Sequence, residues 1–132
     1  MAKRSDLIGL GVPYAVANIQ ANEPALVTVQ GTSIGSAFVI GGQQYLNVVN
    51  ATNAGQFVQL PTVGGFTGCL LGDDFLINNQ LAATIVVCAP SAATISVSGN
   101  NVSGGAGFSM SAHTTTAFYA ITATSWLGLK GS

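Results

Sequence analysis

The stretch TISVSGNN, residues 94–101, carries the clearest fold signal in the chain. Its first five residues alternate between polar and apolar side chains, which is the period of a strand that buries one face. The glycine and two asparagines that follow are residue types that favour a tight turn. Residues 107–111 (GFSMS) resume the alternation. This part of the chain therefore predicts short strands separated by turns.

The same pattern extends outward over most of the chain after residue 24. Alternating or short apolar runs predict further strands at 26–30, 34–40, 45–50, 57–60, 75–77, 84–88, 115–122 and 126–129. The run at 84–88 is apolar on both faces and ends at Pro90, which favours a central strand. No segment here has the 3.6-residue period of a helix. The sequence also has no fixed internal repeat of the kind that indicates a solenoid. We expect an all-β fold, namely a small antiparallel β-sandwich or barrel.

Residues 1–24 differ from the rest and predict a short, partly helical N-terminal arm. Ser5 and Asp6 are suited to cap a first helical turn, and Pro13 is suited to open a second short helix over 14–20. The arm is too short to fold alone. The chain therefore divides into an arm, residues 1–24, and a single β domain, residues 25–132.

The arm is also rich in apolar side chains, so we expect it to dock against a partner or an adjacent copy. The residues expected to make this contact are Leu7, Ile8, Leu10, Val12, Pro13, Tyr14 and Ile19.

The low charge of the chain limits what it can do. Only 5% of the residues are charged, against about 25% in an ordinary soluble chain. Between Pro24 and Leu129 the formal charges are Asp73 and Asp74. Three basic residues cannot neutralise many phosphates, so nucleic acid is not an expected partner. No run of apolar residues is long enough to span a membrane, so we expect no membrane contact.

Such a surface has two explanations. Either copies of the chain or other proteins cover much of it, or hydroxyl and amide groups carry the exposed face. We favour the first, because 48% of the residues are hydrophobic. The run 115–122 is apolar or small on both faces, so one face can fill the core while a neighbouring subunit covers the other. The residues expected at this subunit interface are Phe118, Tyr119, Ile121 and Trp126.

Few residues are candidates for catalysis or metal binding. His113 lies among Ser111 and three threonines, but no G-x-S-x-G pattern accompanies it, so we expect a loop histidine. Asp73 and Asp74 are neighbours, and neighbouring strand residues point to opposite faces, so we expect a turn and not a paired-carboxylate or metal site. The residues 104–107 are glycine-rich but lack the lysine and helix of a phosphate loop. We expect no catalytic site, no cofactor and no metal.

Cys69 and Cys88 are the only cysteines. Two cysteines in a chain of this length do not make a disulfide scaffold. We expect two buried thiols in strands, with one disulfide between neighbouring strands as the alternative.

A set of turns and apolar positions resembles the small β modules of tailed-bacteriophage structural proteins, which occur in head decoration (cement) proteins, head fibres and tail fibres. The positions are Leu60-Pro61, Gly72-Asp73-x-Phe75-x-Ile77-x-Asn79, Val86-Val87, Pro90, Ile95 and Trp126. The segment 7–13 (LIGLGVP) is similar to N-terminal pieces of such virion proteins. Cys88 and the scarcity of charge depart from this pattern.

The resemblance implies a homotrimeric capsid decoration protein, made in the host cytoplasm, that binds the major capsid protein on the head exterior and stabilises the shell. The residues alone predict an apolar arm and a charge-poor β domain with surplus apolar surface. A fibre or receptor-binding module that contacts host glycans is the alternative, and a small hydrolase built around His113 is a third hypothesis.

Overall fold

The computed structural model of the chain describes residues 24–27, 29, 31–41, 46–49, 56–64 and 68–131. The predicted arm, apart from Pro24, lies outside these residues, as do all seven of its expected docking residues. All other described residues belong to the predicted β domain.

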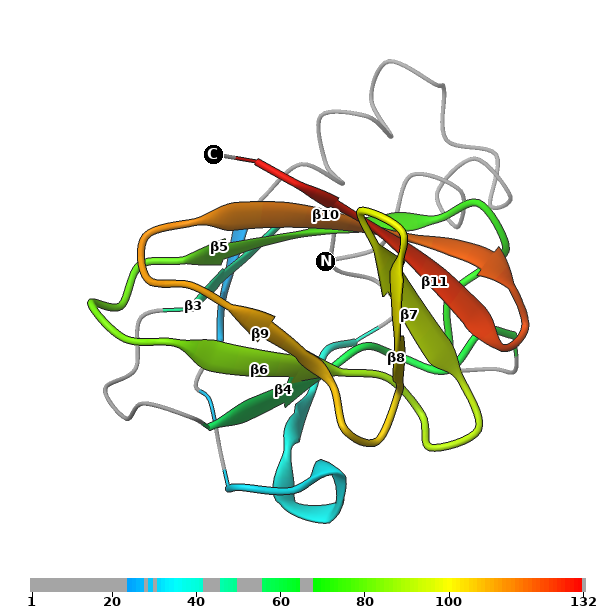
Figure 1. The fold of residues 1–132 in the computed structure, drawn as a ribbon, viewed down its shortest axis with the longest axis horizontal. Helices are drawn as coiled ribbons and strands as arrows, with labels where there is room; N and C mark the ends of the chain where they lie inside the picture. Colours follow the sequence, from blue (N-terminus) through cyan, green and yellow to red (C-terminus); the bar gives the residue numbers. More distant parts are fainter. Residues whose placement is uncertain are drawn as a thin grey trace.

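The described residues form two β-sheets (Figure 1). The seven-stranded sheet has the order β1 (Pro24–Val27), β3 (Leu46–Val49), β5 (Asp74–Asn79), β10 (Thr115–Thr122), β11 (Ser125–Lys130), β7 (Thr94–Val97) and β8 (Asn100–Ser103). The four-stranded sheet has the order β2 (Phe38–Val39), β4 (Phe57–Gln59), β6 (Ile85–Cys88) and β9 (Phe108–Met110). A single 3-10 turn, η1 (Ile34–Ser36), precedes β2. The described residues include no helix long and apolar enough to cross a membrane.

The predicted all-β class is confirmed, but the predicted antiparallel arrangement is wrong, because the sheets are mixed. The parallel pairs are β1–β3, β3–β5, β2–β4, β4–β6 and β11–β7. The antiparallel pairs are β5–β10, β10–β11, β6–β9 and β7–β8. Alternation of side chains reports only that a strand presents different residues to its two faces, so it cannot distinguish the two arrangements.

The parallel pairs arise because the chain passes back and forth between the sheets. Strands β1, β3 and β5 enter the larger sheet in turn, and β2, β4 and β6 enter the smaller sheet between them. The spacing between equivalent residues is unequal: Leu46 pairs with Leu76 and Pro24 with Leu46, while Phe38 pairs with Val58 and Val58 with Val87. This wrapping therefore leaves no fixed repeat in the sequence.

Side chains from both sheets form one hydrophobic core. Its largest fully buried members are Trp126, Phe75, Phe118, Ile40, Leu60, Ile77, Ile85, Ile95 and Met110. Phe75 and Trp126 pack with their ring centroids 5.8 Å apart, and Phe108 meets Phe118 at 6.2 Å, both within the range for favourable aromatic pairs. Burying an aromatic or aliphatic side chain of this size contributes about 1.5–3 kcal/mol.

Asn79 is a buried polar residue that ties three segments together. Its Nδ2 donates to the carbonyl oxygens of Ala83 (2.9 Å) and Ser111 (3.0 Å), with a longer contact to that of Met110 (3.4 Å). Its Oδ1 accepts the Leu81 N–H at 3.0 Å. The side chain thus joins the end of β5, the connection to β6 and the turn between β9 and β10.

Most predicted strands are confirmed, with two exceptions. Residues 34–36, predicted as part of a strand, form the turn η1, and only Phe38–Val39 pair as β2. Asn100 and Asn101, predicted as turn residues, begin β8, because the turn occupies Ser98 and Gly99. The central position predicted for 84–88 is confirmed, since β6 lies between β4 and β9.

Candidate interaction surface

The feature that stands out from the rest of the molecule is the outer face of the seven-stranded sheet, meaning the face turned away from the core. Along β10 and β11, core residues alternate with residues on this face. The outer face carries Leu26 of β1, Leu76 of β5, Ala117, Tyr119 and Ile121 of β10, and Leu127 and Leu129 of β11. The middle parts of β10 and β11 are therefore apolar on both sides.

Several of these apolar side chains are exposed to solvent. Six large apolar side chains are exposed in the described part of the chain, and three of them lie on the outer face: Leu26 (73%), Ile121 (52%) and Leu129 (53%). Leu26 lies apart from the other two, because the ladder runs from it through Asn78 to Thr115 at the opposite end of β10 from Ile121. Ile121 and Leu129 instead border the half-buried pair of Tyr119 and Leu127. Scattered single apolar residues need no explanation, but such a group on one face indicates a contact surface.

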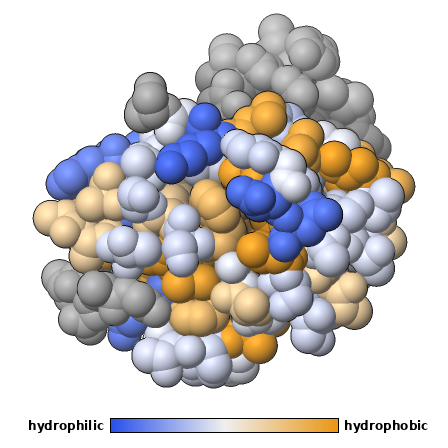
Figure 2. All heavy atoms as spheres, in the orientation of Figure 1, coloured by the Kyte–Doolittle hydropathy of each residue, from blue (hydrophilic) through white to orange (hydrophobic). Residues whose placement is uncertain are grey.

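Two more exposed apolar residues adjoin the same surface. Leu70 (49%) and Leu71 (62%) lie in the turn that leads into β5. The Gly72 N–H donates to the Ala120 carbonyl at 2.8 Å, which holds this turn beside the end of β10 and close to Ile121. Figure 2 shows apolar residues gathered at the right-hand rim of the view, near the end of β10. The sixth exposed residue, Val39, belongs to β2 in the other sheet.

The outer face becomes polar, but not charged, towards β7 and β8. Thr94 and Ser96 of β7 lie opposite Ser103 and Asn101 of β8. Figure 2 shows hydrophilic residues over the β7–β8 hairpin. An apolar centre with an uncharged polar margin is the composition found at protein–protein interfaces.

Charges are scarce over the described residues. Asp73 accepts the Leu70 N–H through Oδ2 at 2.9 Å, in the turn that the sequence predicts before β5. Asp74 begins β5 on the outer face, opposite Tyr119. Lys130 ends β11 and is exposed. The outer face thus has little charge that would oppose its burial.

The four predicted interface residues divide into two kinds. Phe118 and Trp126 are 0% and 1% exposed and belong to the core of the chain itself, so they have no surface to offer a second subunit. Tyr119 is half-buried and Ile121 is exposed, and both lie on the outer face. The alternation that selects these residues does not say which face is inside. Leu129, Leu71 and Leu26 belong to the surface and are absent from the predicted residues.

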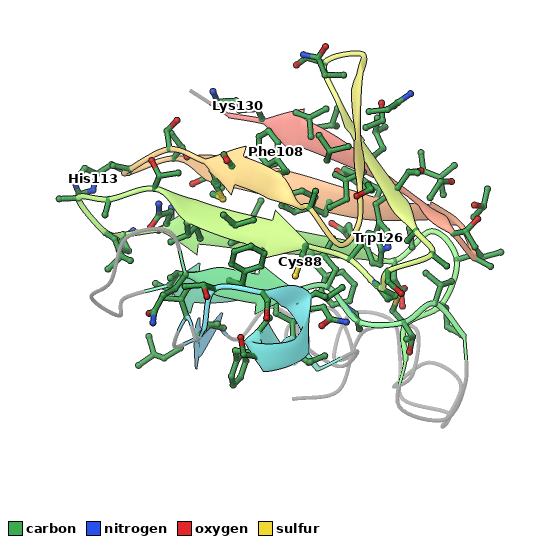
Figure 3. The ribbon with its side chains drawn as sticks, turned by 60° about the horizontal axis from the view of Figure 1, so that its bottom comes forward. Cys88, Phe108, His113, Trp126 and Lys130 are labelled. Atoms are coloured by element: carbon green, nitrogen blue, oxygen red, sulfur yellow. The ribbon has the colours of Figure 1, made fainter. Side chains whose placement is uncertain are left out.

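The residues considered for chemistry are not brought together. His113 is exposed in the turn between β9 and β10, with a left-handed φ of 54° (Figure 3). Its N–H donates to the Leu81 carbonyl at 3.2 Å. Asp74 pairs with Tyr119, whereas the His113 end of the β5–β10 ladder pairs Asn78 with Thr115. The histidine and the carboxylates therefore lie at opposite ends of that ladder, and the described residues hold no cluster of metal-binding side chains.

Both cysteines are buried thiols and no disulfide joins them, as predicted. Only Cys88 lies in a strand, because Cys69 forms an isolated bridge with Val63. The Cys88 thiol lies in β6 and contacts the Val58 carbonyl at 3.4 Å. Burial raises the pKa of this thiol to about 11, while its hydrogen bonding lowers the pKa by a smaller amount. Cys88 therefore stays protonated at neutral pH and acts as a small apolar core residue.

Comparisons with protein-family models, with curated proteins and with solved structures find no match to this chain.

Proposed function

We propose that the protein is a non-enzymatic structural subunit that works in many copies on a larger particle, and that this particle is a bacteriophage virion. The observation that carries the proposal is the outer face, where apolar residues on β1, β10 and β11 are exposed in the single chain. A surface of this kind is unfavourable in water and is stabilised when another protein covers it.

The composition supports the same proposal. The chain has a formal net charge of -1, and in its described part only Asp73, Asp74 and Lys130 carry full charges. Free soluble proteins use mixed surface charge to stay apart in solution. A subunit that functions while bound to its neighbours does not need this protection.

The virion, the head exterior and the count of three subunits rest on the resemblance in turn and apolar positions. In this proposal the protein is a homotrimeric decoration protein that binds the major capsid protein after the shell forms. Many weak contacts, summed over the copies, would then hold the shell together against internal pressure. The arm, residues 1–24, would add a second contact through its apolar residues.

We also infer that the two sheets form a sandwich that closes along one side. The single core shared by both sheets supports face-to-face packing. Gly104 supports the closure: its N–H donates to the Ala93 carbonyl (2.7 Å) and its carbonyl accepts the Ala89 N–H (3.0 Å), so the end of β8 meets the end of β6.

Charged substitutions on the outer face test the proposal. We expect Ile121→Lys and Leu129→Lys to lower the mass of the purified assembly in light scattering, because each places an ammonium group in the covered surface. Ala82→Lys, at an exposed position in the turn between β5 and β6, is the matched control and should leave the mass unchanged. All three variants should remain folded, with the circular dichroism spectrum of the wild type. A wild-type protein that is a stable monomer at micromolar concentration, or outer-face variants of unchanged mass, would contradict the proposal.

A further inference from the structure

The free edge of β8 is the second place where the described chain is open to a partner. β8 is the last strand of the seven-stranded sheet, and β7 is its only neighbour among the described strands. Asn100, Asn101 and Ser103 are exposed, and Val102 is half-buried. Nothing in the described residues covers the outward side of the strand.

The geometry of the hairpin decides which backbone groups point outward. Its loop is the two residues Ser98 and Gly99, with φ values of 52° and 82°, as in the type I′ turn that suits two-residue hairpins. Val97 and Asn100 therefore form the hydrogen-bonded pair that closes the loop. Hydrogen-bonded and non-bonded pairs alternate along an antiparallel ladder, so Asn101 and Ser96 form a non-bonded pair. The N–H and C=O of Asn101 point away from β7.

Ser103 is the next residue along β8 whose backbone groups point outward, and its carbonyl already has partners within the chain. The Ser103 carbonyl accepts the N–H groups of Ala106 (3.1 Å) and Gly107 (3.0 Å) in the turn that leads to β9. Asn101 is thus the position on this edge where both a donor and an acceptor face outward together.

Apart from the shortness of the four-residue β8, the described edge lacks the usual features that prevent strands from pairing with other chains. Natural edge strands are protected by charged side chains, proline, bulges or covering segments. The hairpin of β7 and β8 contains no charged residue and no proline, and its register is regular from Thr94↔Ser103 to Val97↔Asn100. A second copy can therefore approach without repulsion between like charges.

We infer that β8 is a self-association site, where β8 of a second copy pairs with it antiparallel about a two-fold axis beside Asn101. The Asn101 N–H of each copy then donates to the Asn101 C=O of the other. A two-fold axis uses both outward groups at once and makes the edge complementary to itself. The contact needs only the backbone groups of two copies of this uncharged edge.

The pairing deepens the proposed function and rests on it, because it concerns a protein that acts in many copies. The two larger sheets become one continuous sheet, and both outer faces turn towards the same side. Two apolar surfaces then lie side by side and can be covered together, which strengthens their contacts through effective concentration. The contact at β8 is separate from the outer face. It therefore joins two copies regardless of how many copies associate through the outer face.

Cysteine cross-linking tests the pairing directly. Residues in a hydrogen-bonded antiparallel pair have Cα atoms about 5.5 Å apart, which is within the range for a disulfide. We expect Asn101→Cys to form a covalent dimer rapidly under mild oxidation at micromolar concentration. Thr94→Cys is the matched control: it is exposed on the same face but lies one strand further from the axis, so it should cross-link slowly.

Removal of the outward donor gives an independent test. Proline is tolerated in an edge strand where the N–H faces solvent, so Asn101→Pro should keep the bonds to β7 and the fold. We expect it to halve the mass of the assembly in sedimentation velocity. The inference is overturned if Asn101→Cys cross-links no faster than Thr94→Cys, or if a folded Asn101→Pro protein keeps the wild-type mass.

The cross-linking is repeated in the Leu129→Lys background to separate the two proposals. Rapid dimer formation there supports the β8 contact even if the outer face proves to have no partner. Slow cross-linking in both backgrounds, together with a lower mass for Leu129→Lys alone, removes the β8 contact and leaves the proposed function standing.

Discussion

At the scale of single residues, Asn79 and Cys88 are buried groups on which the stability of the fold depends. Asn79 is 0% exposed, and its side chain satisfies backbone groups of two other segments. We expect Asn79→Ala to lower the free energy of unfolding by about 2–4 kcal/mol, because it leaves several backbone groups buried without partners. Asn78→Ala, at the neighbouring position on the opposite face, is the control and should cost less than about 1 kcal/mol. Denaturant unfolding of both variants measures the difference, and equal losses would show that Asn79 does not have this role.

Cys88 gives the fold a dependence on alkaline pH. Its pKa is about 11 in the folded chain against a reference value of 9.0. The folded state therefore holds its proton when the unfolded state has lost it. This stabilisation is fully present below pH 9 and is lost as the pH rises from 9 to 11. The loss amounts to about 2–3 kcal/mol at most.

The Cys88→Ala variant isolates this contribution from other groups that titrate in the same range. We expect the wild-type protein to lose more stability between pH 9 and 11 than the variant does, when both are followed by chemical unfolding. Parallel pH profiles for the two proteins would mean that the Cys88 thiol is not protected by burial.

Between secondary-structure elements, the contact of β10 with β11 depends on a glycine. Gly128 pairs with Phe118, and a Cβ at this position would lie 2.6 Å from Val97 Cγ2 and 3.3 Å from Phe118 Cε1. The Phe118 ring thus occupies the space above the glycine. We expect Gly128→Ala to cost about 1–3 kcal/mol through overpacking.

Gly105→Ala is the control for this substitution, because a Cβ there meets nothing within 4 Å and the backbone is not left-handed. It should be neutral or slightly stabilising, by up to about 1 kcal/mol. Thermal unfolding of the two variants side by side decides whether the close packing at Gly128, and not the loss of a glycine as such, is responsible.

How far the sequence predicts these elements depends on how local their cause is. The strand over 115–122 is predicted at its observed bounds because alternation and turn residues are local properties. The order of strands in the sheets is not predictable in this way, because it depends on contacts between distant residues. The residue types of Asn100 and Asn101 predict a turn there. In the structure the turn lies earlier, because Ser98 adopts the left-handed conformation. The outer face follows from the two-sided apolar pattern, but only the structure shows which residues face outward.

At the scale of the whole molecule, the described residues form a β domain with a buried core and an exposed apolar surface. Both sheets form one core, and the larger sheet still exposes apolar residues on its outer face and, at β8, an edge that no described strand covers. Neither feature helps a free monomer. Both become favourable contacts when many copies cover a particle, which is why the proposed function is structural.

Membership of a virion is the core of this proposal, and quantification of the chain in purified particles tests it. Particles separated on a density gradient are analysed by quantitative mass spectrometry against the major capsid protein. We predict that the protein sediments with the particles, in a copy number that is a simple ratio of the capsid subunits, and that Leu129→Lys reduces this number. Particles that contain none of the protein, while it remains free in the same lysate, would contradict the proposal.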